Sequence, residues 1–474
     1  MKNHSDKLTK IVATIGPATE TEEILEKIIR AGVNIARFNT KHGTPEWHHE
    51  RILRVKKIAK ELNTAVAVLM DLQGPEIRIN LPDEGEFKME EGDKAFFSYK
   101  EDLAEENLIL IPENVVDVLE KGHLILVDDG LCQFEVTKKV NGVIEVKALD
   151  NFTVKHRKTM SIPGVVTDMP VLIENDFVQL DGIKNDEVDY VALSFVRNRQ
   201  DVETLRTELE KRDLSAGIIS KIENQSALDN LDEIIDASDG LMIARGDLGV
   251  EVPFEELIFW QKKMIRKCRA AGKPVITATH MLETMIENPL PTRAEISDVA
   301  NAVYDKTDAV MLSGETTIGK FPVRVVNTQA RIVQFNEQNV DVDLTDYLKE
   351  VNHTNVVDAA IYLLAHELKD IDAVVCLTET GRTAAEISRS RPKLPIHVLT
   401  STKKVYNQLA LHFGLIPHLV DWEGSQLINA KDVMSRLGKV DWVKSGQKVL
   451  IIYGQGHRWR QPGKTNTLSL IEVE

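Results

Sequence analysis

Eight times, the chain repeats a short apolar run rich in β-branched residues, a polar tip and an amphipathic helical stretch. The runs cover residues 10–15, 34–38, 65–70, 190–195, 217–222, 240–244, 274–279 and 309–312. Several are continuously apolar, which is typical of parallel strands covered on both faces. Eight βα units of this size predict a TIM (β/α)8 barrel, a fold that places its chemistry at the C-terminal ends of the strands.

Two segments depart from this repeat, so we expect three domains. Residues 77–166 contain alternating strands around Asn141-Gly142, a good hairpin turn, and predict a small β-barrel domain inserted into the barrel of residues 1–76 and 167–336. An insertion at the C-terminal end of the strands is well placed to act as a lid. Residues 337–474 contain five further β runs separated by helices and predict a doubly wound α/β domain.

Charge and apolar content exclude several classes of function. A formal net charge of -16 argues against general nucleic-acid binding, although a few placed cations can still bind small anions. No run is long enough to cross a bilayer, and the first ten residues lack a signal-type apolar stretch. Three widely separated cysteines show no metal-type spacing. We therefore expect a cytoplasmic protein without nucleic-acid or membrane partners.

Charged residues stand at the ends of the fifth and sixth predicted strands. Glu223 and Asp247 would bring two carboxylates to one place, which suits a hard divalent cation such as Mg²⁺ or Mn²⁺. Lys221 lies two residues before Glu223, on the same strand face, and could reach a transferring phosphoryl group. The spacing alone also permits a neutralised ion cluster at the barrel rim.

Most other strand ends carry polar groups as well. Gly246 lets the backbone approach a ligand closely. The remaining strand-end groups able to bind phosphate, metal or carboxylate are Arg37, Asp71 with Arg78, Thr279, Ser313 and Glu315. Stability alone does not explain this distribution.

Ordered motifs make a family resemblance specific. They are residues 11–17 (IVATIGP), 34–43 (NIARFNTKHG), 71–78 (DLQGPEIR), 219–224 (ISKIEN), 238–249 (SDGLMIARGDLG), 272–285 (GKPVITATHMLETM), 291–303 (PTRAEISDVANAV), 311–316 (MLSGET), 378–383 (TETGRT) and 465–467 (TNT). In this order, over essentially the whole chain, they closely resemble the pyruvate kinase family. The resemblance implies phosphoryl transfer from phosphoenolpyruvate to ADP, giving pyruvate and ATP in glycolysis.

The resemblance also implies residue roles. Glu223 and Asp247 would bind Mg²⁺, and Lys221 would stabilise the phosphoryl group in transfer. The substrate carboxylate would be held by Thr279 and by the backbone of Ala244, Arg245 and Gly246. Arg37 and Arg78 would contact the phosphate, and the pyruvate enolate would be protonated through water near Thr279, Ser313 and Glu315. The nucleotide contacts would be His42 and Arg37, with Lys158 and Asp129 of the insert as weaker candidates for the nucleotide and its metal.

The monovalent-cation site departs from the family pattern. Asn39 and Asp71 are present, but Lys41 replaces the usual serine and Leu72 the usual threonine. We expect the Lys41 ammonium to supply the charge that potassium supplies elsewhere, making activity independent of potassium. The alternative is that Lys41 points to solvent and the site is merely weakened.

The last domain resembles the family's regulatory domain, and a homotetramer is expected from the same resemblance. A sugar phosphate or nucleotide effector would bind Thr378, Thr380, Gly381, Arg382, Thr383, Arg458 and Arg460. The alternative is an ordinary solvated loop. Two other functions stay open at this point, a lyase or aldolase acting on pyruvate enolate and a non-catalytic descendant.

Overall fold

The computed structural model describes residues 7–103, 105–184, 187–340, 371–420, 433, 443–454 and 465–473. Eight parallel strands close into a barrel in the order β1-β16-β15-β14-β13-β12-β3-β2. They are β1 (Lys10–Thr14), β2 (Ile35–Asn39), β3 (Ala67–Asp71), β12 (Tyr190–Leu193), β13 (Gly217–Ile222), β14 (Gly240–Ala244), β15 (Val275–Ala278) and β16 (Ala309–Leu312). The predicted barrel is confirmed, and the strand limits agree with the expected runs to within two residues.

Helices surround the barrel. They are α1 (Glu22–Arg30), α2 (Pro45–Glu61), α4 (Glu174–Asp181), α5 (Arg199–Lys211), α6 (Gln225–Asp229), α7 (Leu231–Ala237), α8 (Arg245–Glu251), η2 (Phe254–Glu256), α9 (Leu257–Ala271), η3 (Glu283–Ile286), α10 (Arg293–Tyr304), α11 (Gly314–Thr317) and α12 (Pro322–Glu337). Thr292 and Glu295 form a capping box at the start of α10. Gly272 ends α9 at φ +69°, a conformation that glycine adopts without strain.

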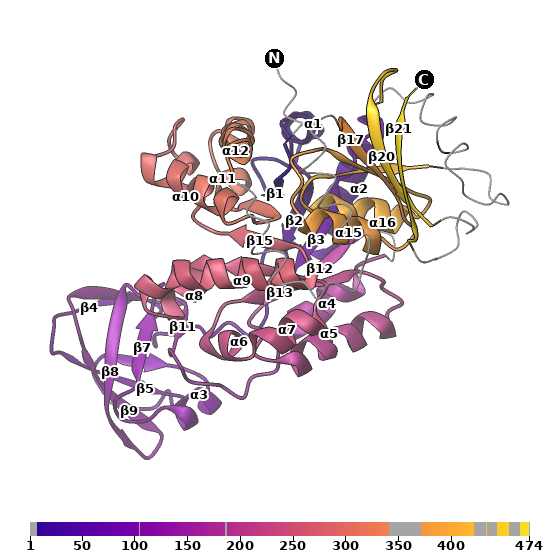
Figure 1. Ribbon diagram of the computed structural model, residues 1–474. Coiled ribbons are helices and arrows are strands. Elements are labelled where there is room, and N and C mark those ends of the chain that lie inside the picture. Colours follow the sequence, from indigo (N-terminus) through magenta and orange to yellow (C-terminus); the bar gives the residue numbers. More distant parts are fainter. Residues whose placement is uncertain are drawn as a thin grey trace.

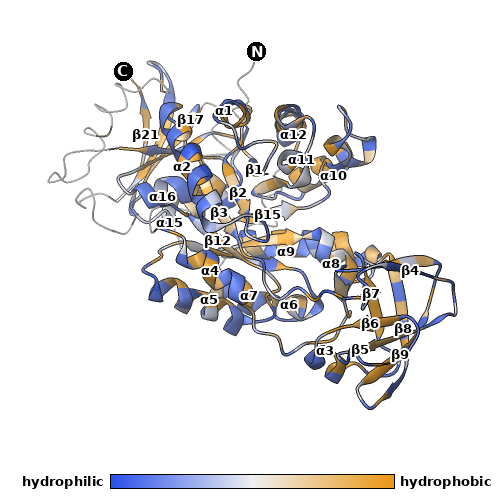
Figure 2. Ribbon diagram, turned by 180° about the vertical axis from the view of Figure 1, so that it is seen from behind, coloured by the Kyte–Doolittle hydropathy of each residue, from blue (hydrophilic) through white to orange (hydrophobic). Residues whose placement is uncertain are grey.

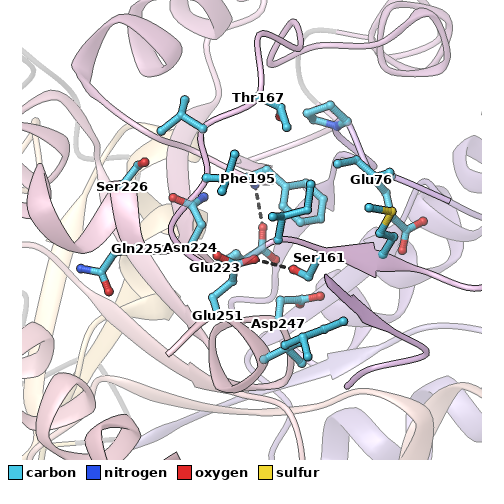
Figure 3. Close-up of a pocket in the computed structure, with 18 of the residues that line it drawn as sticks. Glu76, Ser161, Thr167, Phe195, Glu223, Asn224, Gln225, Ser226, Asp247 and Glu251 are labelled. Carbon is cyan, nitrogen blue, oxygen red and sulfur yellow. Dashed lines mark hydrogen bonds between the residues drawn. The ribbon is translucent and has the colours of Figure 1, made fainter. Parts of the chain in front are cut away.

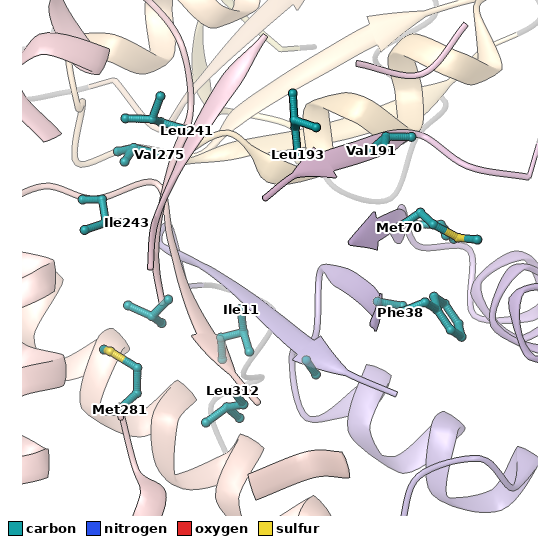
Figure 4. Close-up of a cluster of buried hydrophobic side chains, with 14 of the residues drawn as sticks. Ile11, Phe38, Met70, Val191, Leu193, Leu241, Ile243, Val275, Met281 and Leu312 are labelled. Atoms are coloured by element: carbon teal, nitrogen blue, oxygen red, sulfur yellow. The ribbon is translucent and has the colours of Figure 1, made fainter. Parts of the chain in front are cut away.

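Side chains alternate between two cores along each strand. Those that face outward pack beneath the helices, as Ile11, Leu241 and Leu312 do in Figure 4. The apolar residues that face inward include Val12, Leu69, Ala192, Ile219 and Met242. Two positions further along the first four of these strands the inward residues become polar, namely Thr14, Asp71, Ser194 and Lys221. The two-residue period of a strand therefore gives the barrel an apolar interior and a charged C-terminal mouth.

The insert is a β domain with one helix, α3 (Glu113–Val118). Its strands are β4 (Glu86–Met89), β5 (Lys94–Ser98), β6 (Leu108–Leu110), β7 (Leu124–Val127), β8 (Cys132–Val140), β9 (Val143–Ala148), β10 (Phe152–Lys155) and β11 (Met160–Ser161). They form a six-stranded sheet and a two-stranded sheet. Asn141 and Gly142 connect β8 and β9 with φ of 52° and 80°, as expected for a tight hairpin turn.

The last domain contains a five-stranded sheet in the order β19-β18-β17-β20-β21. Its elements are β17 (Ala373–Leu377), α15 (Arg382–Arg389), β18 (Ile396–Thr400), α16 (Lys403–Gln408), η4 (Leu409–Leu411), β19 (Leu415–Leu419), β20 (Lys448–Tyr453) and β21 (Thr467–Glu472). Among the described strands of this sheet, only β21 is antiparallel to its neighbour. Figure 1 shows this domain and the insert on opposite sides of the barrel.

The last domain packs against the N-terminal mouth of the barrel. Ala410 and Leu411 join the apolar cluster inside the barrel. Asn407 Nδ2 donates to Asp189 Oδ1 at 3.0 Å, and the Tyr190 hydroxyl donates to Gln408 O at 2.9 Å. The start of β12 is therefore bonded directly to α16.

Apolar residues concentrate on the strands, and polar ones cover the outer helix faces (Figure 2). In the described parts of the chain, no helix combines the length and apolarity needed to span a membrane. All three cysteines are buried and unpaired.

Candidate active site

Lys221 lies between two buried carboxylates at the charged mouth of the barrel. Its Nζ is 2.8 Å from Glu223 Oε1 and 3.4 Å from Asp71 Oδ1. Both carboxylate side chains are only 1% exposed. Lys221 and Glu223 come from β13 and its end, whereas Asp71 ends β3. The expected meeting of Lys221 and Glu223 is therefore present.

Arg37 completes the charged cluster from β2. Its Nε donates to Asp71 Oδ2 at 2.6 Å, and its NH1 donates to Thr14 Oγ1 at 2.9 Å. Burial alone would raise the pKa of Asp71, but Lys221 and Arg37 outweigh burial and lower it. Asp71 is thus a fixed negative charge that orients two cations.

For both Lys221 and Glu223, burial and the attraction of the opposite charge shift the pKa in opposite directions. Burial would lower the pKa of Lys221, but Asp71, Glu223 and Asp247 together raise it, so the ammonium stays protonated. Burial raises the pKa of Glu223, with a further contribution from Asp247, against the attraction of Lys221. A second cation near Glu223 would favour its ionised form.

Glu223 and Asp247 face one cavity of about 130 Å³, which the insert and the barrel line together. Figure 3 shows both carboxylates in it, with Ser161 of the insert bonded to Glu251 of α8. Phe195 N donates to Glu223 Oε2 at 2.6 Å, and Glu223 Oε1 lies 2.8 Å from Lys221 Nζ. Two carboxylates that face the same cavity fit a Mg²⁺ ion that keeps several waters.

Backbone N–H groups follow β14, where α8 begins at Arg245. Gly246 N donates to Thr279 Oγ1 at 2.7 Å, so the predicted carboxylate-binding groups are adjacent. Thr279 has φ +65°, an uncommon conformation for a β-branched residue. The Arg245 side chain holds it, because NH2 donates to Thr279 O at 2.6 Å and both terminal nitrogens bond Asp298.

Glu315 connects two loops instead of facing an open site. Its carboxylate is buried and accepts from Ser313 N at 2.7 Å and from Leu282 N at 3.2 Å. Burial raises the pKa of this carboxyl. Its hydrogen bonds organise the loop after β16, next to the segment after Thr279.

Lys41 faces the start of the insert. Its Nζ donates to Glu76 Oε1 at 2.8 Å, and its side chain is 31% exposed. Arg78 Nε donates to Glu76 Oε2 at 2.9 Å. Asn39 Oδ1 accepts from the backbone N of Lys41, and Leu72 is buried. Glu76 thus holds the two cations that were expected to lie near the phosphate.

Of the nucleotide candidates, Arg37 belongs to the charged cluster, and the other three are His42, Lys158 and Asp129. Lys158 pairs with Asp128 at 2.9 Å inside the insert. His42 is exposed, and its ring forms no hydrogen bond with any residue that the structure describes. Asp129 lines the cavity and accepts from Thr159 Oγ1 at 3.2 Å. Of these three residues, only Asp129 contributes to the cavity lining that the structure describes.

The predicted effector loop begins α15. Gly381 has φ +80° and donates its N–H to Thr378 Oγ1 at 3.0 Å. The hydroxyls of Thr383 and Thr465 are 2.6 Å apart, which brings two of the family-like motifs together. Arg382 is mostly exposed and pairs with Glu386, and Thr380 accepts weakly from Arg382 N. Arg458 and Arg460 lie outside the described residues.

Sequence reasoning missed three residues of this site. Ser194 accepts a hydrogen bond from Lys221 Nζ at 2.7 Å. Glu76 forms ion pairs with both Lys41 and Arg78, and Glu251 accepts a hydrogen bond from Ser161 of the insert. The two-residue period of β12 would have placed Ser194 inward. The other two depend on contacts between distant segments.

Comparisons with known proteins agree with this geometry. The model of "Pyruvate kinase, barrel domain" matches residues 6–326, and that of "Pyruvate kinase, alpha/beta domain" matches residues 355–471. Curated pyruvate kinases of Staphylococcus saprophyticus and Geobacillus stearothermophilus are each 41% identical, over 98% of this chain and 80% of theirs. A crystal structure of a pyruvate kinase from Cryptosporidium parvum superposes with a TM-score of 0.91 at 31% identity, covering 99% of this chain and 97% of that one. The chain belongs to the pyruvate kinase family of phosphotransferases.

Proposed function

We propose that this enzyme transfers the phosphoryl group of phosphoenolpyruvate to ADP, giving pyruvate and ATP, as a step of glycolysis in the cytoplasm. The observation that carries the proposal is the Lys221 ammonium, held at 2.8 Å from Glu223 beside the cavity that Asp247 also lines. Phosphoryl transfer needs positioning and charge neutralisation more than covalent chemistry by the protein. A buried cation beside two carboxylates supplies both requirements.

Glu223 and Asp247 are the residues that would hold Mg²⁺, or Mn²⁺ in its place. When bound, such an ion would neutralise charge on phosphate and carboxylate oxygens. Lys221 and Arg37 stabilise the phosphoryl group, assisted by Arg78. The substrate carboxylate binds at the N–H groups after Ala244, with the hydroxyl of Thr279.

We further propose that activity does not require potassium. Lys41 and Glu76 support this idea, since an ammonium group is already fixed between the β2 loop and the start of the insert. Leu72 supplies no side-chain oxygen ligand. Asn39 and Asp71 then act as remnants of the cation site.

The domain roles are part of the same proposal. Residues 1–76 and 167–336 form the catalytic domain, in which His42 contacts the nucleotide, and residues 77–166 form a lid that brings Asp129 and Lys158 to it. Residues 337–474 bind a phosphorylated effector at the loop of Thr378 to Thr383, with Arg458 and Arg460. The enzyme assembles as a homotetramer.

Pyruvate formation from phosphoenolpyruvate, ADP and Mg²⁺ tests the activity, in matched sodium and potassium salts. We expect ADP-dependent pyruvate and ATP in equal amounts, at equal rates in both salts. Pyruvate and inorganic phosphate formed without ADP would indicate hydrolysis instead of transfer to ADP. No product in either salt would indicate a lyase with another substrate or a non-catalytic protein. Strong activation by potassium would refute the role of Lys41 while leaving the main activity intact.

A further inference from the structure

We propose that Ser194 is a positioning residue that fixes the Lys221 ammonium for phosphoryl transfer. This inference rests on the proposed function and assigns a role to a residue that neither the motifs nor the pattern of charges identified. Ser194 directly follows β12 and is 1% exposed.

The hydrogen-bond directions define what Ser194 can do. Its Oγ donates to Leu72 O at 2.7 Å, and a hydroxyl has only one hydrogen to donate. Its oxygen lone pairs are therefore left for Lys221 Nζ, which donates to it at 2.7 Å. Ser194 acts on the lysine only as an acceptor, and the Leu72 carbonyl maintains that role.

The third partner of the ammonium differs from the other two in charge. Asp71 and Glu223 are carboxylates that attract Lys221, whereas Ser194 is neutral. A neutral acceptor fixes one N–H direction of a flexible side chain without adding negative charge at the site. The ammonium is thus held in place while its charge remains directed at the transferring group.

The same turn also places Glu223. Phe195, the next residue, has φ +55° and donates its N–H to Glu223 Oε2 at 2.6 Å. A Cβ added at Gly74 would lie 2.9 Å from Ser194 Cβ, so the turn is packed tightly against the β3 loop. Ser194 and Phe195 therefore fix the lysine and the carboxylate from one rigid dipeptide.

A matched pair of variants separates this role from simple packing. Ser194→Thr keeps the hydroxyl, and Ser194→Val has nearly the same shape without it, so both suffer equally from crowding near Gly74. We expect Val to lower kcat about 10- to 100-fold relative to Thr, with KM for phosphoenolpyruvate changed less than about threefold. Equal kcat in the two variants would refute the proposal. Melting temperatures of both confirm that each is folded.

A double-mutant cycle with Lys221 tests whether Ser194 acts through the lysine. Ser194→Ala should lower kcat in the wild-type background but cause little further loss in a Lys221→Ala background. A full further loss in that background would show that Ser194 acts on the fold instead, and would overturn the inference.

Crystal structures of the Thr and Val variants give a test that needs no activity. We expect Lys221 Nζ to keep its place in the Thr variant and to shift away from residue 194 in the Val variant. An unmoved Nζ in both would contradict the proposal. Absence of pyruvate formation by the wild-type enzyme would refute the proposed function but would leave this structural test decisive.

Discussion

Lys41 Nζ lies 2.8 Å from Glu76 Oε1, so the lysine of the β2 loop is bonded to the residue that precedes the insert. Glu76 also forms an ion pair with Arg78. The Lys41 ammonium is therefore tied to the start of the insert by a contact between residues 35 positions apart.

Restoring side-chain oxygens at the monovalent-cation site should restore a response to potassium. The double variant Lys41→Ser, Leu72→Thr removes the ammonium and adds two hydroxyls near Asn39 and Asp71. We expect potassium to raise its initial rate about tenfold over sodium, because an exchangeable cation then replaces a fixed charge. The wild-type enzyme should show no such difference.

The exposed Lys57 provides the control for this variant. It pairs with Glu22 on the outer face of α2, so Lys57→Ser should change neither the rate nor the response to salt. A double variant equally active in both salts would show that Lys41 does not occupy the role of the cation.

Replacing Lys221 by alanine should remove most of the transition-state stabilisation at the site. We expect kcat to fall about 10³-fold, or about 4 kcal/mol, since a preorganised donor at the reacting phosphate is lost. Binding of Mn²⁺, measured by titrating the enzyme with the ion, should be retained because Glu223 and Asp247 remain. Lys211→Ala, on the exposed face of α5, is the matched control. Near-full turnover of Lys221→Ala would mean that the lysine has another role.

Arg245→Lys should damage the site without removing any predicted substrate-binding group. Lysine cannot bond both oxygens of Asp298 and Thr279 O at once, so the Thr279 turn loses its support. We expect kcat/KM for phosphoenolpyruvate to fall about 10- to 100-fold, measured in steady-state assays. Arg30→Lys, on the exposed face of α1, should leave kcat/KM unchanged. Unchanged kcat/KM would show that the turn holds its shape alone.

His412 should make the fold more sensitive to acid. Its pKa is lowered from an ordinary 6.5 to about 4, chiefly by burial, with Asp308 raising it and Arg391 and Lys10 lowering it. Between those values the unfolded chain binds a proton that the folded chain does not, so stability falls as pH falls from 6.5 towards 4.

The test compares His412→Asn with the wild-type enzyme. At pH 5 the variant should lose about 1–2 kcal/mol less of its pH 7.5 stability, measured by urea unfolding at the two pH values. His280→Asn, which changes an exposed histidine, should follow the wild type. Parallel losses in His412→Asn and wild type would contradict the assignment.

Much of the fold follows from local patterns in the sequence. The strand periods predict the barrel, and the two-residue alternation places Lys221 and Glu223 on one inward face. The hairpin turn at Asn141 is a local signal too, and it is confirmed. These features depend on neighbours within a few residues, which is why the sequence reveals them.

The rest of the site depends on pairs far apart in the chain. Arg245 holds Asp298, 53 residues away, and its side chain supports Thr279 where only its backbone was expected to act. The bond between Ser194 and Lys221 spans 27 residues. No local pattern specifies which of several charged residues will pair across the barrel mouth. These pairs are set by the tertiary structure, so the sequence alone does not predict them.

β12 is four residues long, and both of its ends are anchored. Its first residue, Tyr190, is bonded to α16, and Ser194, one step beyond its last, is bonded to Lys221. At about 3.3 Å per residue the span is about 13 Å. A displacement of α16 would therefore be transmitted along this short strand to the Lys221 ammonium. A strand of four residues can absorb little of such a displacement.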